Sequence, residues 1–209
     1  MKLKILIFAF IFIVSASLWA GGRVVDRPYK LLIPPQPVQT GDKIEVVEVF
    51  WYGCPHCFQF EPYLEKWLEQ KPDDVEFVRL PGVLGKGWIP HARAFYAAEQ
   101  LGVLDKIHRP LFNAIHIEGE HLANEDQLAR FFENQNIDED DFRDAFNSEG
   151  VDQEVKQAFM RGRDFRITGV PTVIVNGKYL TSASMAGSHE NVIKIIDELI
   201  TRERSNSPE

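Results

Sequence analysis

The sequence predicts an α/β fold in which a block of helices interrupts a core of strands and helices. A β-branched and aromatic run at 44–51 is followed by helical spacing and then by a second apolar run at 75–80. Helical periodicity holds from about 88 to 166, and strand character returns at 169–180. Because strand-rich parts flank one helical stretch, we expect an all-helical subdomain inserted into an α/β domain.

Residues 1–20 are typical of an export signal. Lys2 and Lys4 precede an unbroken apolar run over 5–14, and small residues follow up to Ala20. The run is shorter than the roughly 20 apolar residues of a spanning helix. We therefore predict a signal peptide at 1–20, with an uncleaved anchor as the alternative. Export would place the protein in an oxidising compartment, where a disulfide can persist.

The first part of the core is predicted as loop, strand, helix and strand. Residues 21–43 are proline-containing and typical of a loop. The run at 44–51 is apolar almost throughout, as in a strand buried on both faces, and Glu48 alone breaks this pattern. Apolar side chains at helical spacing then predict a helix over 58–70, and a second strand follows at 75–80.

The helical block and the final elements follow from caps and turns. Asn124 and Gln127 form a capping pair, Asn176-Gly177 is a strong hairpin signal, and Ser188 can cap a closing amphipathic helix. The predicted helices of the block lie at about 90–101, 103–116, 125–134, 139–147 and 151–166.

Composition narrows the classes of partner. The chain is 44% hydrophobic and 26% charged, which is ordinary for a globular protein. Its formal net charge of −8 argues against nucleic acid or an anionic membrane surface as the main partner. Proteins and small molecules therefore remain as the possible partners.

The two cysteines of the chain, Cys54 and Cys57, stand in the tetrad CPHC. A structural zinc site needs four ligands, and His116 and His121 are the one downstream histidine pair with suitable spacing. A structural disulfide across so short a loop would remove little entropy from the unfolded chain. A reactive dithiol is therefore the favoured interpretation over both, with no metal and no cofactor expected.

The predicted strand-to-helix junction favours an acidic first thiol. At a helix N-terminus, unpaired N–H groups and a partial positive charge would stabilise a Cys54 thiolate by at most about 2 kcal/mol, or about 1.5 pKa units. His56 is the expected second contributor, as an imidazolium or as a neutral donor. A low pKa stabilises the reduced dithiol and makes the disulfide a stronger oxidant.

The export signal, the segment EVFWYGCPHCFQFE, the helical block and TGVPTVIVNG together resemble the DsbA family of exported thiol:disulfide oxidoreductases. The resemblance covers nearly the whole chain after the signal. It implies a thioredoxin fold with an inserted helical domain, which divides this chain into a thioredoxin-like domain at 21–84 and 167–209 and a helical domain at 85–166. The segment 77–90, rich in Gly and Pro, departs from the pattern at the rim of the substrate groove.

The same resemblance implies roles for individual residues of the tetrad. Cys54 corresponds to the nucleophilic, solvent-facing thiol, and Cys57 to its more buried partner. Pro55 and His56 form the dipeptide between them, in which His56 tunes the pair.

Three further residues take implied roles. Val170 and Pro171 correspond to the loop whose proline is cis in thioredoxin folds, and the Val170 backbone would pair with an extended substrate. Glu48 matches a buried acidic residue of this fold and is expected to relay protons to Cys57. Arg79, in the neighbouring strand, is the expected partner of Glu48. A Glu48 that faces solvent at a strand edge is the alternative.

The implied function is that of a periplasmic dithiol oxidase that donates its Cys54–Cys57 disulfide to folding secreted proteins through a mixed disulfide at Cys54. Its implied partners are reduced secreted or periplasmic proteins and a membrane oxidase of the DsbB type, and a monomer is expected. Two alternatives differ in class: an isomerase or reductase of the same fold, and a chaperone that uses the groove near Pro171 without thiol chemistry.

Overall fold

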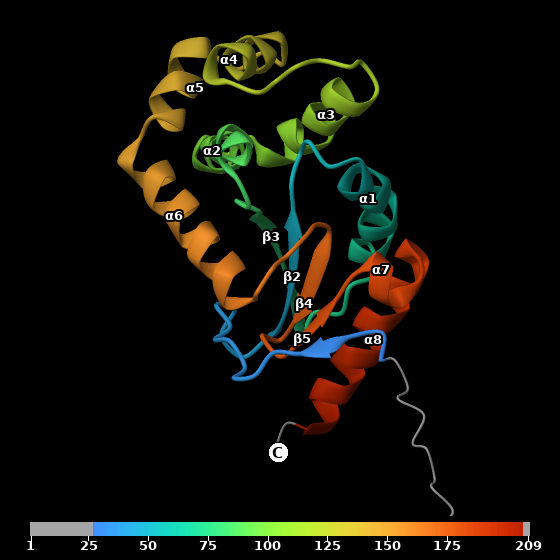
Figure 1. Ribbon diagram of the computed structural model, residues 1–209. Helices are drawn as coiled ribbons and strands as arrows, with labels where there is room; N and C mark the ends of the chain where they lie inside the picture. The colour runs from blue at the N-terminus through green and yellow to red at the C-terminus, as the bar shows by residue number, and fades with distance from the viewer. Residues whose placement is uncertain (1–26, 207–209) are drawn as a thin grey trace, which may run out of the picture.

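The computed structural model describes residues 27–206, which form a five-stranded sheet with helices on both faces (Figure 1). The strand order is β1-β5-β4-β2-β3. The predicted α/β fold with a helical insertion is confirmed. The predicted signal peptide at 1–20 lies outside the described residues. Within residues 27–206, no helix combines the length and apolar character needed to cross a membrane.

The sheet is mixed. Its two longest strands, β2 and β3, are neighbours, and β3 is an edge strand. β2 and β3 are parallel, whereas β4 pairs antiparallel with β2, β5 with β4, and β1 with β5. β1 corrects the prediction of an uninterrupted loop over 21–43, because a two-residue strand is too short to show a period of two. The strands are β1 Lys30–Leu31, β2 Ile44–Phe50, β3 Val75–Pro81, β4 Thr172–Val175 and β5 Tyr179–Thr181.

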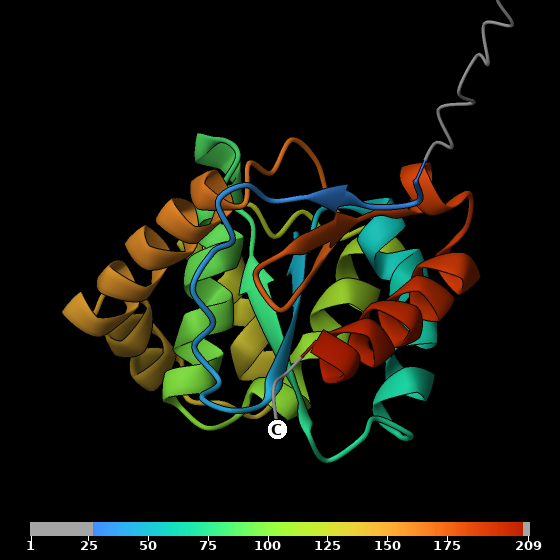
Figure 2. The ribbon, with the colours of Figure 1, turned by 90° about the horizontal axis from the view of Figure 1, so that it is seen from below.

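Two helices cover one face of the sheet. α1 (Pro55–Leu68) and α8 (His189–Asn206) lie side by side there (Figure 2). Because side chains alternate along a strand, Val46 of β2 packs with this layer while Val47 contributes to the core on the opposite face. A short helix, α7 (Ala183–Ala186), precedes α8 and was not predicted.

The inserted helices cover the other face and extend beyond the sheet (Figure 2). All five predicted helices are present between β3 and β4, and the last begins at Glu149 rather than at 151, because Ser148 caps it. The elements are η1 Lys86–Trp88, α2 Ile89–Gln100, α3 Leu104–His116, α4 Glu125–Asn134, α5 Glu139–Phe146 and α6 Glu149–Asp164.

α6 is fixed to the central strand by a buried ion pair. Arg161 Nη2 lies 2.8 Å from Oε1 of Glu45, whose side chain in β2 is fully buried. Glu45 Oε2 also accepts a hydrogen bond from the backbone N–H of Gln39 at 2.9 Å. These two partners replace the hydrogen bonds to water that the Glu45 carboxylate loses on burial. The contact therefore fixes the position of the helical block relative to the sheet.

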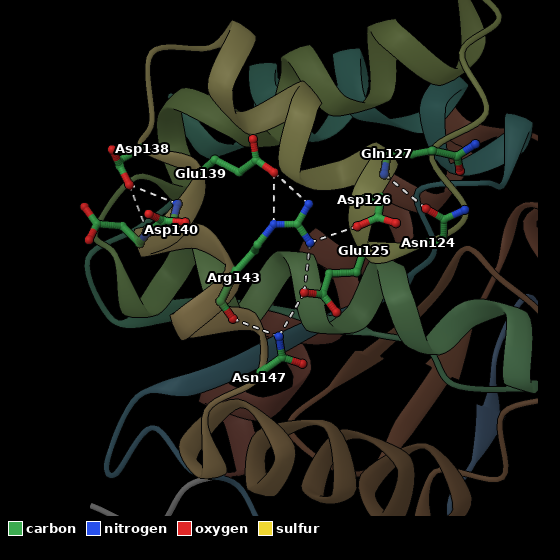
Figure 3. A network of polar contacts seen from close by, with 10 residues as sticks. Asn124, Glu125, Asp126, Gln127, Asp138, Glu139, Asp140, Arg143 and Asn147 are labelled. Atoms are coloured by element: carbon green, nitrogen blue, oxygen red, sulfur yellow. Dashed lines mark hydrogen bonds and ion pairs between the residues drawn. The ribbon is translucent and has the colours of Figure 1, made fainter.

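At the far end of the block, a surface network joins α4 to α5 (Figure 3). Arg143 of α5 contacts Glu139 one turn away and reaches Glu125 and Asp126 at the start of α4. Asp138 caps α5 by accepting from two backbone N–H groups. These charges are exposed, so each contributes little alone; together with the predicted Asn124–Gln127 cap, which is confirmed, they fix where both helices begin.

The predicted hairpin between β4 and β5 is also confirmed. Asn176 and Gly177 both have positive φ, of 51° and 62°, as a two-residue type I′ turn requires. Gly177 additionally accepts a backbone hydrogen bond from Gln36 at 2.8 Å, and a methyl group on it would overlap the carbonyl oxygen of Gln36. Glycine is therefore required here by both conformation and space.

Replacement of Gly177 by alanine should lower the free energy of unfolding by at least about 2 kcal/mol, because it combines a left-handed conformation with a backbone overlap. Urea denaturation measures the change. The matched control is Gly162→Ala within α6, where a methyl group meets open space and should raise stability by about 0.5–1 kcal/mol. Equal effects of the two substitutions would contradict this account of the turn.

Candidate active site

Cys54 is the N-cap residue of α1, immediately after the turn that follows β2. Its backbone is extended (φ −93°, ψ 114°), and its Sγ accepts from the backbone N–H of Cys57 at 3.4 Å. Pro55 occupies the first turn of the helix, where its missing N–H costs nothing and its fixed φ suits the helix. The predicted junction is therefore confirmed, and the sequence CPHC places one sulfur on the unpaired amides of the helix.

The two thiols, both free, have opposite pKa shifts. A hydrogen bond from the Cys57 thiol is the largest cause that lowers the pKa of Cys54 to about 6, and the backbone N–H groups of Cys57 and His56 and the charge of His56 add to it. Burial, followed by the same hydrogen bond, raises the pKa of Cys57 far above its usual range. Cys57 therefore contributes more than His56, which the sequence indicated as the second contributor after the helix N-terminus.

Burial at the pair also differs from the expectation. Cys57 is fully buried, as expected of the inner thiol, but Cys54 is only 8% exposed rather than open to solvent. The cause is the loop before β4: Cys54 Sγ lies 3.5 Å from the carbonyl oxygen of Val170. The Val170–Pro171 peptide bond in this loop is cis, as the resemblance implied.

A groove of about 600 Å³ opens beside the pair and is lined by His56, Val170 and Pro171 together with residues of β1, α7 and α8. The segment 82–88 does not reach this groove and instead borders a second hollow against α6. The departure at 77–90 therefore does not line this groove, although Trp88 of that segment stacks on Trp51 just before the active-site turn. The rim of the groove comes from the N-terminal strand and from the end of α6.

Glu48 is fully buried in the central strand, so the solvent-facing alternative is wrong. Arg79 of β3, its partner in the sheet register, lies with its Nε 3.6 Å from Glu48 Oε2, as expected. The guanidinium is shared, however: its Nη2 lies 3.0 Å from Glu61 of α1. Burial and the nearby Glu61 charge raise the pKa of Glu48 well above its usual range, despite Arg79.

Glu61 and His108 complete this buried cluster and were not predicted. Burial opposes the charge of Glu61, but contacts with His108 and Arg79 outweigh it and hold its pKa below the usual value. His108 Nε2 lies 3.3 Å from Glu61, and Nδ1 lies 2.9 Å from the hydroxyl of Tyr52. Burial lowers the pKa of His108, and a neutral ring can accept the Tyr52 hydroxyl proton at Nδ1 while its Nε2 faces Glu61.

The sequence contained a signal for one of these two residues. Glu61 follows Cys57 by four positions, so both lie on the buried face of one helix. No comparable signal marks His108, because it comes from α3 and meets the site only through the packing of the helical block. His116, weighed above as a zinc ligand, lies with Nε2 2.7 Å from the carbonyl oxygen of Tyr52 and stacks on Phe58.

Comparisons with known proteins agree on one family. A family model described as a DSBA-like thioredoxin domain matches residues 79–191. The thiol:disulfide interchange protein DsbA of Pseudomonas aeruginosa is 40% identical over 186 residues, which cover 89% of this chain and 88% of that protein. The DsbA of Azotobacter vinelandii is 41% identical over 181 residues, covering 87% of this chain and 85% of that protein.

Solved structures give the same result. The crystal structure of Pseudomonas aeruginosa DsbA superposes with a TM-score of 0.82 at 41% identity and covers 86% of this chain and 93% of its own. DsbA from Xylella fastidiosa superposes with a TM-score of 0.80 at 36% identity, over 85% of this chain and 95% of its own. The likeness therefore spans both the sheet and the inserted helices.

Titration of the reduced protein should find Cys54 ionising near pH 6, and Cys57→Ala should raise this midpoint by more than His56→Ala does, because it removes the largest stabilising contact. Thiolate ultraviolet absorbance measures the midpoint. The exposed Gln59→Ala change in the same helix is the control and should leave the midpoint unchanged. A larger rise with His56→Ala would restore the imidazole as the main cause.

Proposed function

The chain belongs to the DsbA family of thiol:disulfide interchange proteins and is a thiol:disulfide oxidoreductase, and we propose that it acts as an exported oxidase that donates its Cys54–Cys57 disulfide. The opposed pKa shifts at the two sulfurs carry this proposal. At neutral pH the reduced form keeps a stabilised Cys54 thiolate, which the disulfide form lacks. Stabilising the reduced form raises the reduction potential, so the disulfide is readily given up.

The transfer proceeds in two exchange steps. A substrate thiolate attacks Cys54 Sγ, the Cys54–Cys57 bond breaks, and Cys57 leaves and takes up a proton. A second substrate thiolate then attacks the substrate sulfur of the mixed disulfide and releases Cys54 as a thiolate. The substrate loses two electrons and two protons; the protein gains both electrons and one proton, and the other proton enters solvent.

The groove and the loop before β4 support a site for the substrate. Val170 and Pro171 line the groove next to Cys54, and an extended peptide laid there can pair with the Val170 backbone. We assign residues 21–84 and 167–209 to the thioredoxin-like domain that holds this site, and 85–166 to the inserted domain. The chain acts as a monomer in the periplasm on reduced secreted proteins, after removal of residues 1–20, and a membrane oxidase of the DsbB type regenerates its disulfide.

Glu48 serves as the proton donor to Cys57 in the first step. It is fully buried and its pKa is raised well above the usual range, which favours the protonated form that a donor needs, and its carboxyl group is near enough to influence the pKa of the Cys57 thiol. Arg79 and Glu61 form the tighter pair, so Glu48 is the carboxyl group of the two that holds the proton. A neutral acid inside the protein can neutralise a leaving thiolate where solvent does not reach.

The reduction potential tests the proposed oxidase. The potential, measured by equilibration with glutathione, should fall by about 59 mV per pH unit below pH 6, where two protons accompany the two electrons. Above pH 6 it should fall by about 30 mV per pH unit, because Cys54 ionises at about 6 and only one proton then accompanies the two electrons. Cys54→Ser should abolish disulfide transfer to a reduced unfolded protein. A potential below about −300 mV, as in structural disulfides, would refute donation and favour a reductase.

The proton relay predicts that Glu48→Gln slows the opening of the Cys54–Cys57 disulfide by a substrate thiol by about tenfold or more at neutral pH. The amide of the substituted side chain has the shape of the protonated Glu48 carboxyl group and should leave the midpoint of the Cys54 titration near pH 6. A slower rate would therefore reflect the loss of proton delivery alone. Stopped-flow kinetics with a reduced peptide measure the rate. Glu65→Gln, the same substitution at an exposed position of α1, is the control. A rate within twofold of the wild type would exclude the relay.

A further inference from the structure

The groove beside Cys54 has a charge opposite to that of the whole chain. Lys30 of β1, Arg166 at the end of α6, and the histidines at 56 and 189 line it, and among residues 27–206 no Asp or Glu does so. The chain as a whole carries a formal charge of −8. Segments distant in sequence are therefore brought together to give a basic groove on an acidic protein, and Figure 2 shows the segment that follows β1 passing beside the end of α6.

The two permanent cations of this groove are available to a ligand. Lys30 and Arg166 are both exposed, and within residues 27–206 neither forms an ion pair with a carboxylate. Arg166 donates through Nη2 to the carbonyl oxygen of Ile33 at 2.8 Å, which fixes the side chain against the segment that follows β1. A guanidinium has five N–H donors, so this contact leaves the others free to meet an anion.

The backbone at Arg166 provides an independent observation. Arg166 has φ of 55° and directly follows Phe165, the C-cap of α6, while the N–H of Ile167 bonds back to Gly162 at 3.0 Å. This left-handed position after a helix is the one that glycine fills best. An arginine here is strained, and strain at a groove rim points to a role in binding rather than in stability.

We propose that this groove selects substrate segments that carry Asp or Glu close to the reacting cysteine, with Lys30 and Arg166 as the residues that determine this preference. The proposal rests on the oxidase function above and specifies its substrate class. Apolar lining residues such as Leu180 and Met185 contact any extended chain, whereas the two cations distinguish segments by charge. Such complementarity acts mainly on encounter and is weakened by salt.

Matched peptides test the selection directly. Reduced dithiol peptides that differ only by Asp, Asn or Lys beside the first cysteine are mixed with the oxidised full chain, and the rate of loss of its disulfide is followed. Each rate is divided by that of the same peptide with the uncharged bis(2-hydroxyethyl) disulfide, which corrects for the effect of flanking charge on the peptide thiol. The Asp peptide should react about three- to fivefold faster than the Asn peptide and the Lys peptide more slowly, and the differences should disappear at about 1 M salt.

Variants assign the effect to the two cations. Lys30→Gln and Arg166→Gln should each lower the Asp-to-Asn rate ratio by about twofold, and the double variant should bring it close to one. Arg130→Gln, which removes the same charge from an exposed position on α4, is the control and should keep the wild-type ratio. Arg166→Gly should lower the ratio while the melting temperature stays equal or rises, which separates binding from folding.

A wild-type ratio of one at low salt, or a ratio insensitive to both substitutions, would overturn the selection and leave the oxidase function standing. If none of the peptides reduces the oxidised chain, the proposed function fails and this inference fails with it.

Discussion

Cys54 and Cys57 stand three residues apart on one helix, yet the first lies on the unpaired amides of the helix N-terminus and the second lies in the apolar interior. The same thiol–thiolate hydrogen bond lowers the pKa of one sulfur and raises that of the other. The asymmetry is therefore a property of the pair. The backbone N–H groups of His56 and Cys57 serve the sulfur anion as donors, whereas the Val170 carbonyl oxygen beside Cys54 is an acceptor for the protonated thiol.

The two buried carboxyl groups near the cysteine pair also differ from each other in their pKa values. One guanidinium, that of Arg79, faces two carboxyl groups, and the group with a second partner in His108 takes the charge. The pKa of Glu48 is raised because burial and the neighbouring Glu61 charge disfavour a second anion beside one cation. The helical block contributes to this balance through His108, so the insertion does more than cover one face of the sheet.

Local signals predicted the elements well, because caps, turns and apolar periods are encoded by neighbouring residues. The Asn176-Gly177 turn, the Asn124 cap and the tetrad at the helix start are of this kind. The two-residue strand β1 and the Glu61–His108 contact were missed, since pairing across the chain creates both. For the same reason the sequence identified His56 as the tuning residue but underestimated Cys57, whose effect depends on how deeply its sulfur is buried.

The position of β4 in the sheet has a consequence for the newly made chain. β4 pairs with β2, so Val46 meets Val175 only after the whole helical insertion has been synthesised. Contacts of such long sequence separation form late, because closing a long loop costs entropy before it returns any stabilisation. The loop that covers Cys54 directly precedes β4. A partly emerged chain therefore lacks the contact between Cys54 and the Val170 loop, and the groove beside the pair is complete only when nearly the entire polypeptide is available.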